Sequence, residues 1–323
     1  MRVIVIGAGA MGTLFGTTLI KGGHEVVFLD SWQPLIYAVS QDSVATLKQG
    51  EKVEKIPVQI CFYAEPPEKA VDLIIVFVKS SSTKNAIETI ASKGVILDNT
   101  VILTCQGGFD NPEIISSNMK DPALLLHGCT KSTSKSSGPM TIENFSIGPT
   151  TVWPYKLPVD QKPAQRVFDI VQQCNEAGLN ISVTTQAIAD RWKMLLSYPT
   201  TYAVSAVSGF TFGDVWATAE GRNLLSCLAK EVALIAKKEG IDESLFNEEI
   251  AIKHIEELAL AQPNTPGSML LDIKAHRITE IDATSGTLIR KAISYGLELP
   301  YMSSIWSIMR IKEQNFGCEF ESR

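Results

Sequence analysis

Three glycines near the start of the chain have the spacing of a phosphate-binding turn. The pattern G-x-G-x-x-G follows an apolar run, Val3–Ile6, and opens a stretch with helical spacing, which is the context that a dinucleotide-binding turn requires. The first glycine makes the tight bend, the second lets the backbone approach a pyrophosphate, and the third lets helix and strand pack closely. We therefore expect a dinucleotide to contact these residues: Gly7, Ala8, Gly9, Ala10, Met11 and Gly12.

A carboxylate ends the second apolar run of the chain. Asp30 closes the run Glu25–Asp30, 23 residues after Gly7, where a ribose-binding acid belongs. A carboxylate accepts hydrogen bonds from both ribose hydroxyls and repels the 2′-phosphate of NADP. Asp30 therefore favours NADH over NADPH, by about 5–150-fold in kcat/KM.

Side chains that could move a proton or hold an acid lie in the second half of the chain. Lys193 belongs to a helical pattern dominated by apolar residues, and partial burial makes an ammonium a better proton donor to a carbonyl that becomes an alkoxide. Ser268, Asp272 and Glu280 are spaced by multiples of about four along what reads as one long helix, so they could share a face that holds a hydroxy acid. The alternatives are a lysine whose charged end reaches water and a solvated helix face.

Composition excludes several classes of partner. The 323 residues carry 29 Lys and Arg against 35 Asp and Glu, a formal net charge of −6, and no basic run suits nucleic acid. No apolar stretch approaches the about 18–20 residues of a membrane span, and the first residues read as a strand instead of a signal segment. The four histidines and six cysteines lack the spacing of a metal site or a redox dithiol. We expect a cytoplasmic protein that binds neither metal, membrane nor nucleic acid.

The apolar patterns predict two domains, residues 1–183 and 184–323. The first alternates strands and helices, which indicates βαβ units and a parallel sheet. Within it, Lys131–Pro139 is expected to be an exposed loop and Phe145–Val152 a late antiparallel strand. The second consists of helical patterns separated by prolines. These patterns cover Gln186–Leu196, Gly221–Lys238, Glu248–Ala261, Ser268–Tyr295 and Met302–Gln314.

Together these features resemble the ketopantoate reductase (2-dehydropantoate 2-reductase) family. The resemblance extends over essentially the whole chain, in the order that the family has. The motifs that carry it are the glycine turn, Val78-Lys79 after the Leu73–Val78 run, Thr104-Cys105-Gln106-Gly107-Gly108, Trp192-x-Lys193, Ser268-Met269-x-x-Asp272 and Thr279-Glu280-Ile281-Asp282.

The resemblance implies a fold and an activity. The fold is an N-terminal α/β Rossmann-type domain and an all-α C-terminal domain like that of 6-phosphogluconate dehydrogenase, with the active site in the cleft between them. The activity is reduction of ketopantoate to pantoate, in the biosynthesis of pantothenate and coenzyme A. The family's usual hydride donor is NADPH, and a homodimer is compatible with the resemblance.

The resemblance also assigns roles by position. Lys193 matches the catalytic lysine, and Glu280 matches the glutamate that binds and polarises the substrate. Ser268 matches the serine that binds the substrate carboxylate. The residues at cofactor-contacting positions are Lys79, Gln106 and Gly107.

The chain departs from the family where amide side chains would bind the substrate. Gly107 replaces a common asparagine, Ser197 and Thr201 replace asparagines four and eight residues after the lysine, and Thr265 replaces another, with Asn264 beside it. Each lost hydrogen bond costs about 1–3 kcal/mol. Gly107→Asn is therefore expected to improve the use of ketopantoate if the backbone tolerates a side chain.

Three functions remain open at this point. The first is ketopantoate reduction, with Ser197 and Thr201 among the substrate contacts. The second is reduction of another 2-oxo or β-oxo acid by a paralogous enzyme. The third is a dinucleotide-sensing protein without catalysis, which the retention of Lys193 and Glu280 disfavours.

Overall fold

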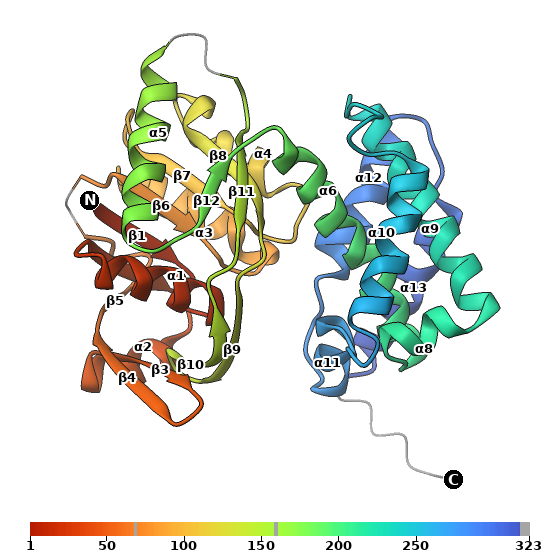
Figure 1. Ribbon diagram of the computed structural model, residues 1–323, viewed down its shortest axis with the longest axis horizontal. Helices are drawn as coiled ribbons and strands as arrows, with labels where there is room; N and C mark the ends of the chain where they lie inside the picture. The colour runs from red at the N-terminus through yellow and green to blue at the C-terminus, as the bar shows by residue number, and fades with distance from the viewer. Residues whose placement is uncertain (68–69, 158–160, 317–323) are drawn as a thin grey trace. The chain divides into compact units, whose positions relative to one another are not determined.

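The computed structural model describes residues 1–67, 70–157 and 161–316 and consists of two compact units (Figure 1). The first contains Met1–Gln106 and Asn111–Ile188, and the second contains Gly107–Asp110 and the chain from Ala189 onward. The expected division after residue 183 stays a prediction. Within the described ranges, no helix combines the length and the hydropathy needed to cross a bilayer.

An eight-stranded sheet forms the centre of the first unit (Figure 1). Its strand order is β12-β11-β8-β7-β6-β1-β2-β5, and neighbouring strands run parallel except for the antiparallel pair β8 and β11. The α/β fold expected for the N-terminal half is thereby confirmed. The strands are β1 (Arg2–Ile6), β2 (Glu25–Asp30), β5 (Gln59–Phe62), β6 (Leu73–Val76), β7 (Val101–Thr104), β8 (Leu125–Thr130), β11 (Thr150–Pro154) and β12 (Ile181–Val183).

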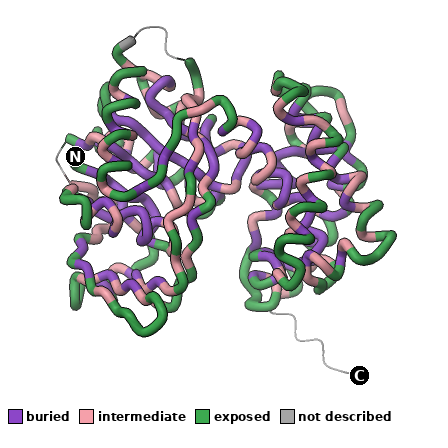
Figure 2. The backbone as a smooth tube through the Cα atoms, viewed as in Figure 1, coloured by how far each residue is buried: buried purple, intermediate pink, exposed green. Residues whose placement is uncertain are grey.

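Successive residues of β1 enter two different hydrophobic clusters. Val3 and Val5 pack with residues of α1 and α5, whereas Ile4 and Ile6 pack with residues of α3 and α4. Side chains alternate between the faces of a strand, so a strand that is apolar at every position is buried on both faces. Figure 2 shows this buried sheet interior in purple. The helices of the unit are α1 (Ala10–Lys21), α2 (Gln33–Asp42), α3 (Ser80–Ser92), α4 (Asn111–Ser116) and α5 (Gln161–Glu176), with a 3-10 turn, η1 (Pro122–Leu124).

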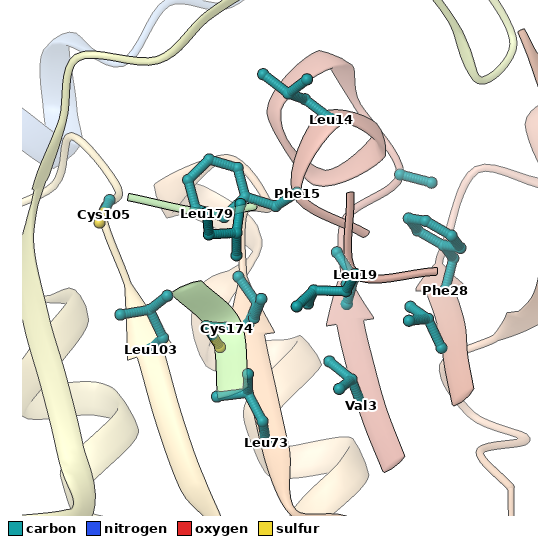
Figure 3. Packing of buried hydrophobic residues seen from close by; sticks show 14 of the residues in the cluster. Val3, Leu14, Phe15, Leu19, Phe28, Leu73, Leu103, Cys105, Cys174 and Leu179 are labelled. Carbon is teal, nitrogen blue, oxygen red and sulfur yellow. The ribbon is translucent and has the colours of Figure 1, made fainter. Parts of the chain in front are cut away.

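Helix α1 packs on the sheet through large aromatic side chains (Figure 3). Phe15 on the helix and Phe28 on β2 are both fully buried, and burial of such a side chain stabilises the fold by about 1.5–3 kcal/mol. A Cβ on Gly16 would lie 2.3 Å from Cζ of Phe28. The glycine therefore allows the ring of β2 to lie against the helix backbone, which fixes the position of the turn that precedes α1.

A second, four-stranded sheet in the first unit corrects two expectations. Its order is β4-β3-β10-β9, and the expected loop at 131–139 contains the strand β9. The expected strand Phe145–Val152 is divided between the end of β10 and the start of β11. The side chains of β9 are mostly exposed, which explains its polar, loop-like composition. The strands are β3 (Val44–Gln49), β4 (Lys52–Pro57), β9 (Thr133–Gly138) and β10 (Thr141–Ser146).

The second unit is built from helices, as expected. Side-chain caps mark several starts: Thr218 accepts from Gly221 N ahead of α9, and Asn247 from Ile250 N ahead of α10. Two turns, η2 and η3, have π-helical hydrogen bonding. The elements are α6 (Gln186–Ser197), which begins in the first unit, η2 (Tyr198–Tyr202), α7 (Ala203–Ser208), α8 (Phe212–Ala217), α9 (Ala219–Lys238), α10 (Glu248–Ala261), α11 (Ser268–Lys274), η3 (Asp282–Gly286), α12 (Thr287–Ser294) and α13 (Pro300–Gln314).

The prediction of one long helix over Ser268–Tyr295 is wrong. Helix α11 ends at Lys274, where the Arg277 guanidinium turns back to Asp272 Oδ1 at 2.8 Å, and His276 has a φ of +51°. The backbone N–H of Arg277 also donates to the Asp272 carbonyl at 2.9 Å. This reversal separates α11 from η3, so Ser268, Asp272 and Glu280 do not share one helix face.

Candidate active site

The glycine-rich turn after β1 has the geometry that a dinucleotide requires. Gly7 has a φ of +98°, and a Cβ built on it would lie 2.7 Å from the backbone nitrogen of Val78. A Cβ on Gly12 would lie 1.9 Å from the carbonyl oxygen of Gly7. Glycine is required at both positions, because one has a left-handed backbone and the other a close approach of helix and turn.

The middle glycine of the turn is open to a ligand. Helix α1 begins at Ala10 with Gly9 as its N-cap, and no side chain caps it. A Cβ on Gly9 would meet no atom within 4 Å. The first N–H groups of the helix, those of Ala10, Met11 and Gly12, have no acceptor within the helix. The turn therefore fits the pyrophosphate of a dinucleotide, which would accept from these groups.

Three backbone N–H groups hold the carboxylate of Asp30 beside this turn. Oδ2 accepts from Ala8 N at 2.8 Å, and Oδ1 accepts from Ser31 N and Trp32 N at 2.8 and 3.0 Å. Rotation of the carboxylate away from the turn would break all three bonds. The N–H of Ala8 is used by Asp30, so a cofactor would have to contact Ala8 through other atoms.

The side chain of Gln106 is engaged within the protein. Its Nε2 donates to the Val78 carbonyl at 2.6 Å and to Thr83 Oγ1 at 2.8 Å, while Oε1 accepts from Thr104 Oγ1 at 2.9 Å. Both amide protons are thereby used. Gln106 joins the ends of β6 and β7 and fixes the segment that leads to Lys79, whose exposed side chain immediately precedes α3.

The residues that follow Gln106 belong to the helical unit. The segment Gly107–Asp110 groups with that unit, and buried Arg191 donates from Nη2 to the carbonyls of Gly108 and Phe109 at 3.2 and 3.3 Å. The Phe109 ring packs edge-on against Trp192, with 5.6 Å between ring centroids. The segment that follows Gln106 therefore contacts the residues that precede Lys193 on α6.

Lys193 lies half-buried on α6, next to apolar residues. Its neighbours Trp192, Leu195 and Leu196 are buried, and its own side chain is partly accessible. Its carbonyl oxygen accepts from Ser197 Oγ at 3.1 Å. The placement suits a proton donor, because the side chain remains accessible to a substrate.

Hydroxyl side chains follow Lys193 at one-turn intervals. Ser197 ends α6, and Thr201 lies in η2; both are buried, with 6% and 0% of their surface exposed. Thr201 Oγ1 has no hydrogen-bond partner among the described residues. A buried hydroxyl without a partner is costly, and π-helical turns are frequent at functional sites. Both observations make η2 a candidate part of the site.

The other expected substrate residues lie on elements that contact η2. Ser268 is the exposed first residue of α11, and half-buried Glu280 precedes η3. Both α11 and η3 pack against η2. The expected substrate residues therefore do not share one helix face. Instead, the π-helical turn η2 is the common neighbour of α11 and η3. The backbone of Thr265 is used locally, because its carbonyl accepts from Phe212 N at 2.9 Å.

Two features near this site have no local signal in the sequence. The buried carboxylate of Glu313 accepts from the backbone N and the hydroxyl of Thr279 at 2.8 and 2.6 Å, which fixes the residue next to Glu280. His254 Nε2 lies 3.3 Å from Ser197 Oγ. Both contacts join residues more than 30 positions apart in the chain, so no periodicity or spacing could have indicated them.

Comparisons with known proteins agree over both units. The family described as ketopantoate reductase PanE/ApbA matches residues 3–156, and its C-terminal family matches residues 186–313. The 2-dehydropantoate 2-reductase of Streptococcus pyogenes serotype M1 is 26% identical over 316 residues, covering 97% of this chain and 98% of that protein.

Solved structures have the same fold. D-mandelate dehydrogenase in a ternary structure with NADH and anilino(oxo)acetate has a TM-score of 0.85 at 24% identity, covering 98% of this chain and 100% of that one. A dimeric ketopantoate reductase from Staphylococcus aureus has a TM-score of 0.78 at 20% identity, with coverage of 98% and 100%. The chain therefore belongs to the ketopantoate reductase family and is an NAD(P)-dependent oxidoreductase.

Proposed function

We propose that this protein reduces a 2-oxo acid to the 2-hydroxy acid with NADH, and that Lys193 donates the proton. The observation that carries the proposal is the half-buried ammonium on α6, followed at one-turn intervals by the buried hydroxyls of Ser197 and Thr201. An ammonium supplies the proton that a new alkoxide needs, and hydroxyls supply hydrogen bonds to the oxygens of an acid.

The chain's own residues bind the acid and move one proton. A reduced nicotinamide, when bound, supplies the hydride that the carbonyl carbon receives. Lys193 Nζ gives its proton to the carbonyl oxygen, so the product is a neutral alcohol and Lys193 is left as an amine. Glu280 orients the substrate, and Ser268 binds its carboxylate. The contact between Thr279 and buried Glu313 restrains the backbone on which Glu280 stands.

The cofactor is proposed to be NADH. Asp30 is held by three N–H donors, so its carboxylate stays where it accepts ribose hydroxyls and opposes a 2′-phosphate. The net discrimination is about 1–3 kcal/mol after screening. The D-mandelate dehydrogenase of similar fold was determined with NADH. Residues 7–12, Lys79 and the backbone of Gln106 and Gly107 are proposed to form the rest of the cofactor site.

Ketopantoate is the first substrate to test, because the curated S. pyogenes relative that matches 97% of the chain is a 2-dehydropantoate 2-reductase. A bulkier 2-oxo acid such as phenylglyoxylate is the second. The specific observation that favours it is the loss of amide side chains at Gly107, Ser197 and Thr201. We also propose a homodimer, on the basis of the dimeric S. aureus protein.

Steady-state kinetics with purified protein test the proposal. NADH oxidation is measured with ketopantoate, phenylglyoxylate and a series of aliphatic 2-oxo acids, and NADPH is compared at each substrate. Turnover with at least one acid is expected, with NADH preferred. Tight NADH binding without turnover on any acid would instead support a dinucleotide sensor. The proposed homodimer is tested separately, by size-exclusion chromatography with light scattering.

A further inference from the structure

Helix α10 places a histidine beside the catalytic lysine's helix. His254 lies on the inner side of α10, between the buried residues Ala251 and Ile255, and it is half-buried. Its Nε2 is 3.3 Å from Ser197 Oγ. The imidazole therefore contacts the residue that lies one turn after Lys193, at the end of α6.

Counting protons assigns the direction of the contact with Ser197. The single hydroxyl proton of Ser197 points to the Lys193 carbonyl oxygen at 3.1 Å. A hydroxyl has one proton and two acceptor lone pairs, so the contact with His254 uses a lone pair of Ser197 Oγ. If Ser197 keeps its bond to the Lys193 carbonyl, Nε2 of His254 is the donor, which requires the Nε2–H tautomer.

The surroundings keep His254 uncharged at neutral pH. Burial lowers the pKa of His254, and the positive charge of Lys193 lowers it further, while the Glu257 carboxylate and the hydrogen bond to the Lys193 backbone act in the opposite direction. A neutral imidazole can donate one hydrogen bond beside an ammonium without adding a second positive charge.

We infer that His254 is a positioning residue that, by donating from Nε2 to Ser197 Oγ, directs the Ser197 hydroxyl as a donor toward the substrate. The inference rests on the proposed reduction of a 2-oxo acid. His254 occupies one lone pair of Ser197 Oγ. The Ser197 hydroxyl then donates its proton either to the Lys193 carbonyl or to an oxygen of the bound substrate. Donation into Oγ also polarises the O–H bond, which makes it a stronger donor.

Kinetics of four variants test the inference. His254→Leu removes the donor, His254→Gln keeps an amide N–H, Ser197→Ala removes its acceptor, and Glu256→Leu is the control at an exposed position of the same helix. His254→Leu is expected to raise KM for the 2-oxo acid about 5–30-fold, with kcat changed less and NADH affinity unchanged. His254→Gln is expected to recover most of this loss. In the Ser197→Ala background His254→Leu should have little further effect.

Three results would overturn the inference. One is a His254→Leu enzyme whose KM equals that of Glu256→Leu; another is an equal effect of His254→Leu with and without the Ser197 hydroxyl. The third comes from the imidazole ¹⁵N chemical shifts of the wild-type protein, in which the Nε2–H tautomer is expected for His254 and the Nδ1–H tautomer would contradict it. This third measurement needs no turnover, so it stands even if the protein reduces no 2-oxo acid. Failure of Lys193→Ala to reduce kcat would contradict the proposed function and leave the tautomer result intact.

Discussion

Gly107 lies against the ring of Tyr198. A Cβ built on Gly107 would stand 2.6 Å from Cζ and 2.8 Å from the hydroxyl oxygen of Tyr198. Tyr198 in turn packs against Tyr202, with 5.1 Å between the ring centroids. An asparagine at position 107 therefore fits only if Tyr198 moves.

We consequently expect Gly107→Asn to lower activity. The new side chain pushes the Tyr198 ring and strains η2, so Tm should fall by several degrees and kcat/KM with the best 2-oxo acid by about 10-fold or more. Gly107→Asn combined with Tyr198→Ala relieves the contact and should recover part of the Tm lost through the asparagine, relative to Tyr198→Ala alone. A Gly107→Asn variant with unchanged Tm and higher kcat/KM for ketopantoate would contradict this expectation. It would show that the site has room for the asparagine and that its amide improves the use of ketopantoate.

Asp30 is expected to set the preference for NADH. Wild-type protein should use NADH over NADPH by about 5–150-fold in kcat/KM. Asp30→Ser removes the charge that repels the 2′-phosphate of NADPH. The variant should therefore have a smaller ratio of kcat/KM with NADH to kcat/KM with NADPH, chiefly because KM for NADPH falls. Asp42→Ser, at the exposed end of α2, is the control. Equal or better rates of the wild type with NADPH would show that the carboxylate does not select the cofactor.

Glu280 is expected to hold the substrate without moving the proton. Glu280→Ala should raise KM for the 2-oxo acid and reduce kcat/KM by about 2–4 kcal/mol in transition-state stabilisation. Glu249→Ala, exposed on α10, serves as the matched control. If KM and kcat of Glu280→Ala match the wild-type values, Glu280 does not hold the substrate.

Buried Glu231 is expected to stabilise the helical unit. Its two carboxylate oxygens accept from Tyr301 N and Met302 N at 2.9 and 2.8 Å, at the start of α13. Glu231→Ala leaves both donors without this acceptor and should lower the free energy of unfolding by about 2–3 kcal/mol. Urea unfolding measures the loss, and a change below about 0.5 kcal/mol would contradict the capping role.

The same residue predicts a pH dependence. Burial raises the pKa of Glu231 in the folded protein above its unfolded value of about 4.3. Its linked contribution to stability is therefore fully present below that unfolded value and is lost as pH rises through the folded pKa. The stability of the wild type relative to Glu231→Gln should accordingly fall between pH 4 and neutrality. A pH-independent difference, or one that grows with pH, would be inconsistent with the raised pKa.

Local patterns in the sequence predicted the elements that depend on local interactions. The runs Glu25–Asp30 and Glu248–Ala261 match β2 and α10, because each has a clear apolar period and a polar boundary. The glycine turn was predicted from its strand and helix context, and its geometry agrees. The family was predicted from motifs and the two-part fold from the apolar patterns, and the comparisons confirm both.

Specific contacts that no apolar period encodes decided what the patterns missed. Strand β9 is a polar strand at the edge of its sheet, and its partner β10 determines its conformation. The helical period continues past Lys274, yet the Asp272–Arg277 ion pair and the contact between Thr279 and Glu313 end the helix there. The roles of the site residues stay predictions, since they depend on a bound substrate.

The central claim is that Lys193 donates the proton, and single-turnover and steady-state kinetics of Lys193→Ala test it most directly. The variant should retain NADH affinity within a few-fold, measured by fluorescence titration, while kcat with the best 2-oxo acid falls by about 10²–10⁴-fold. Lys253→Ala, at an exposed position on α10, should keep wild-type kcat. A Lys193→Ala enzyme that retains more than about a tenth of wild-type turnover would contradict the account, because another group would then have to be the acid.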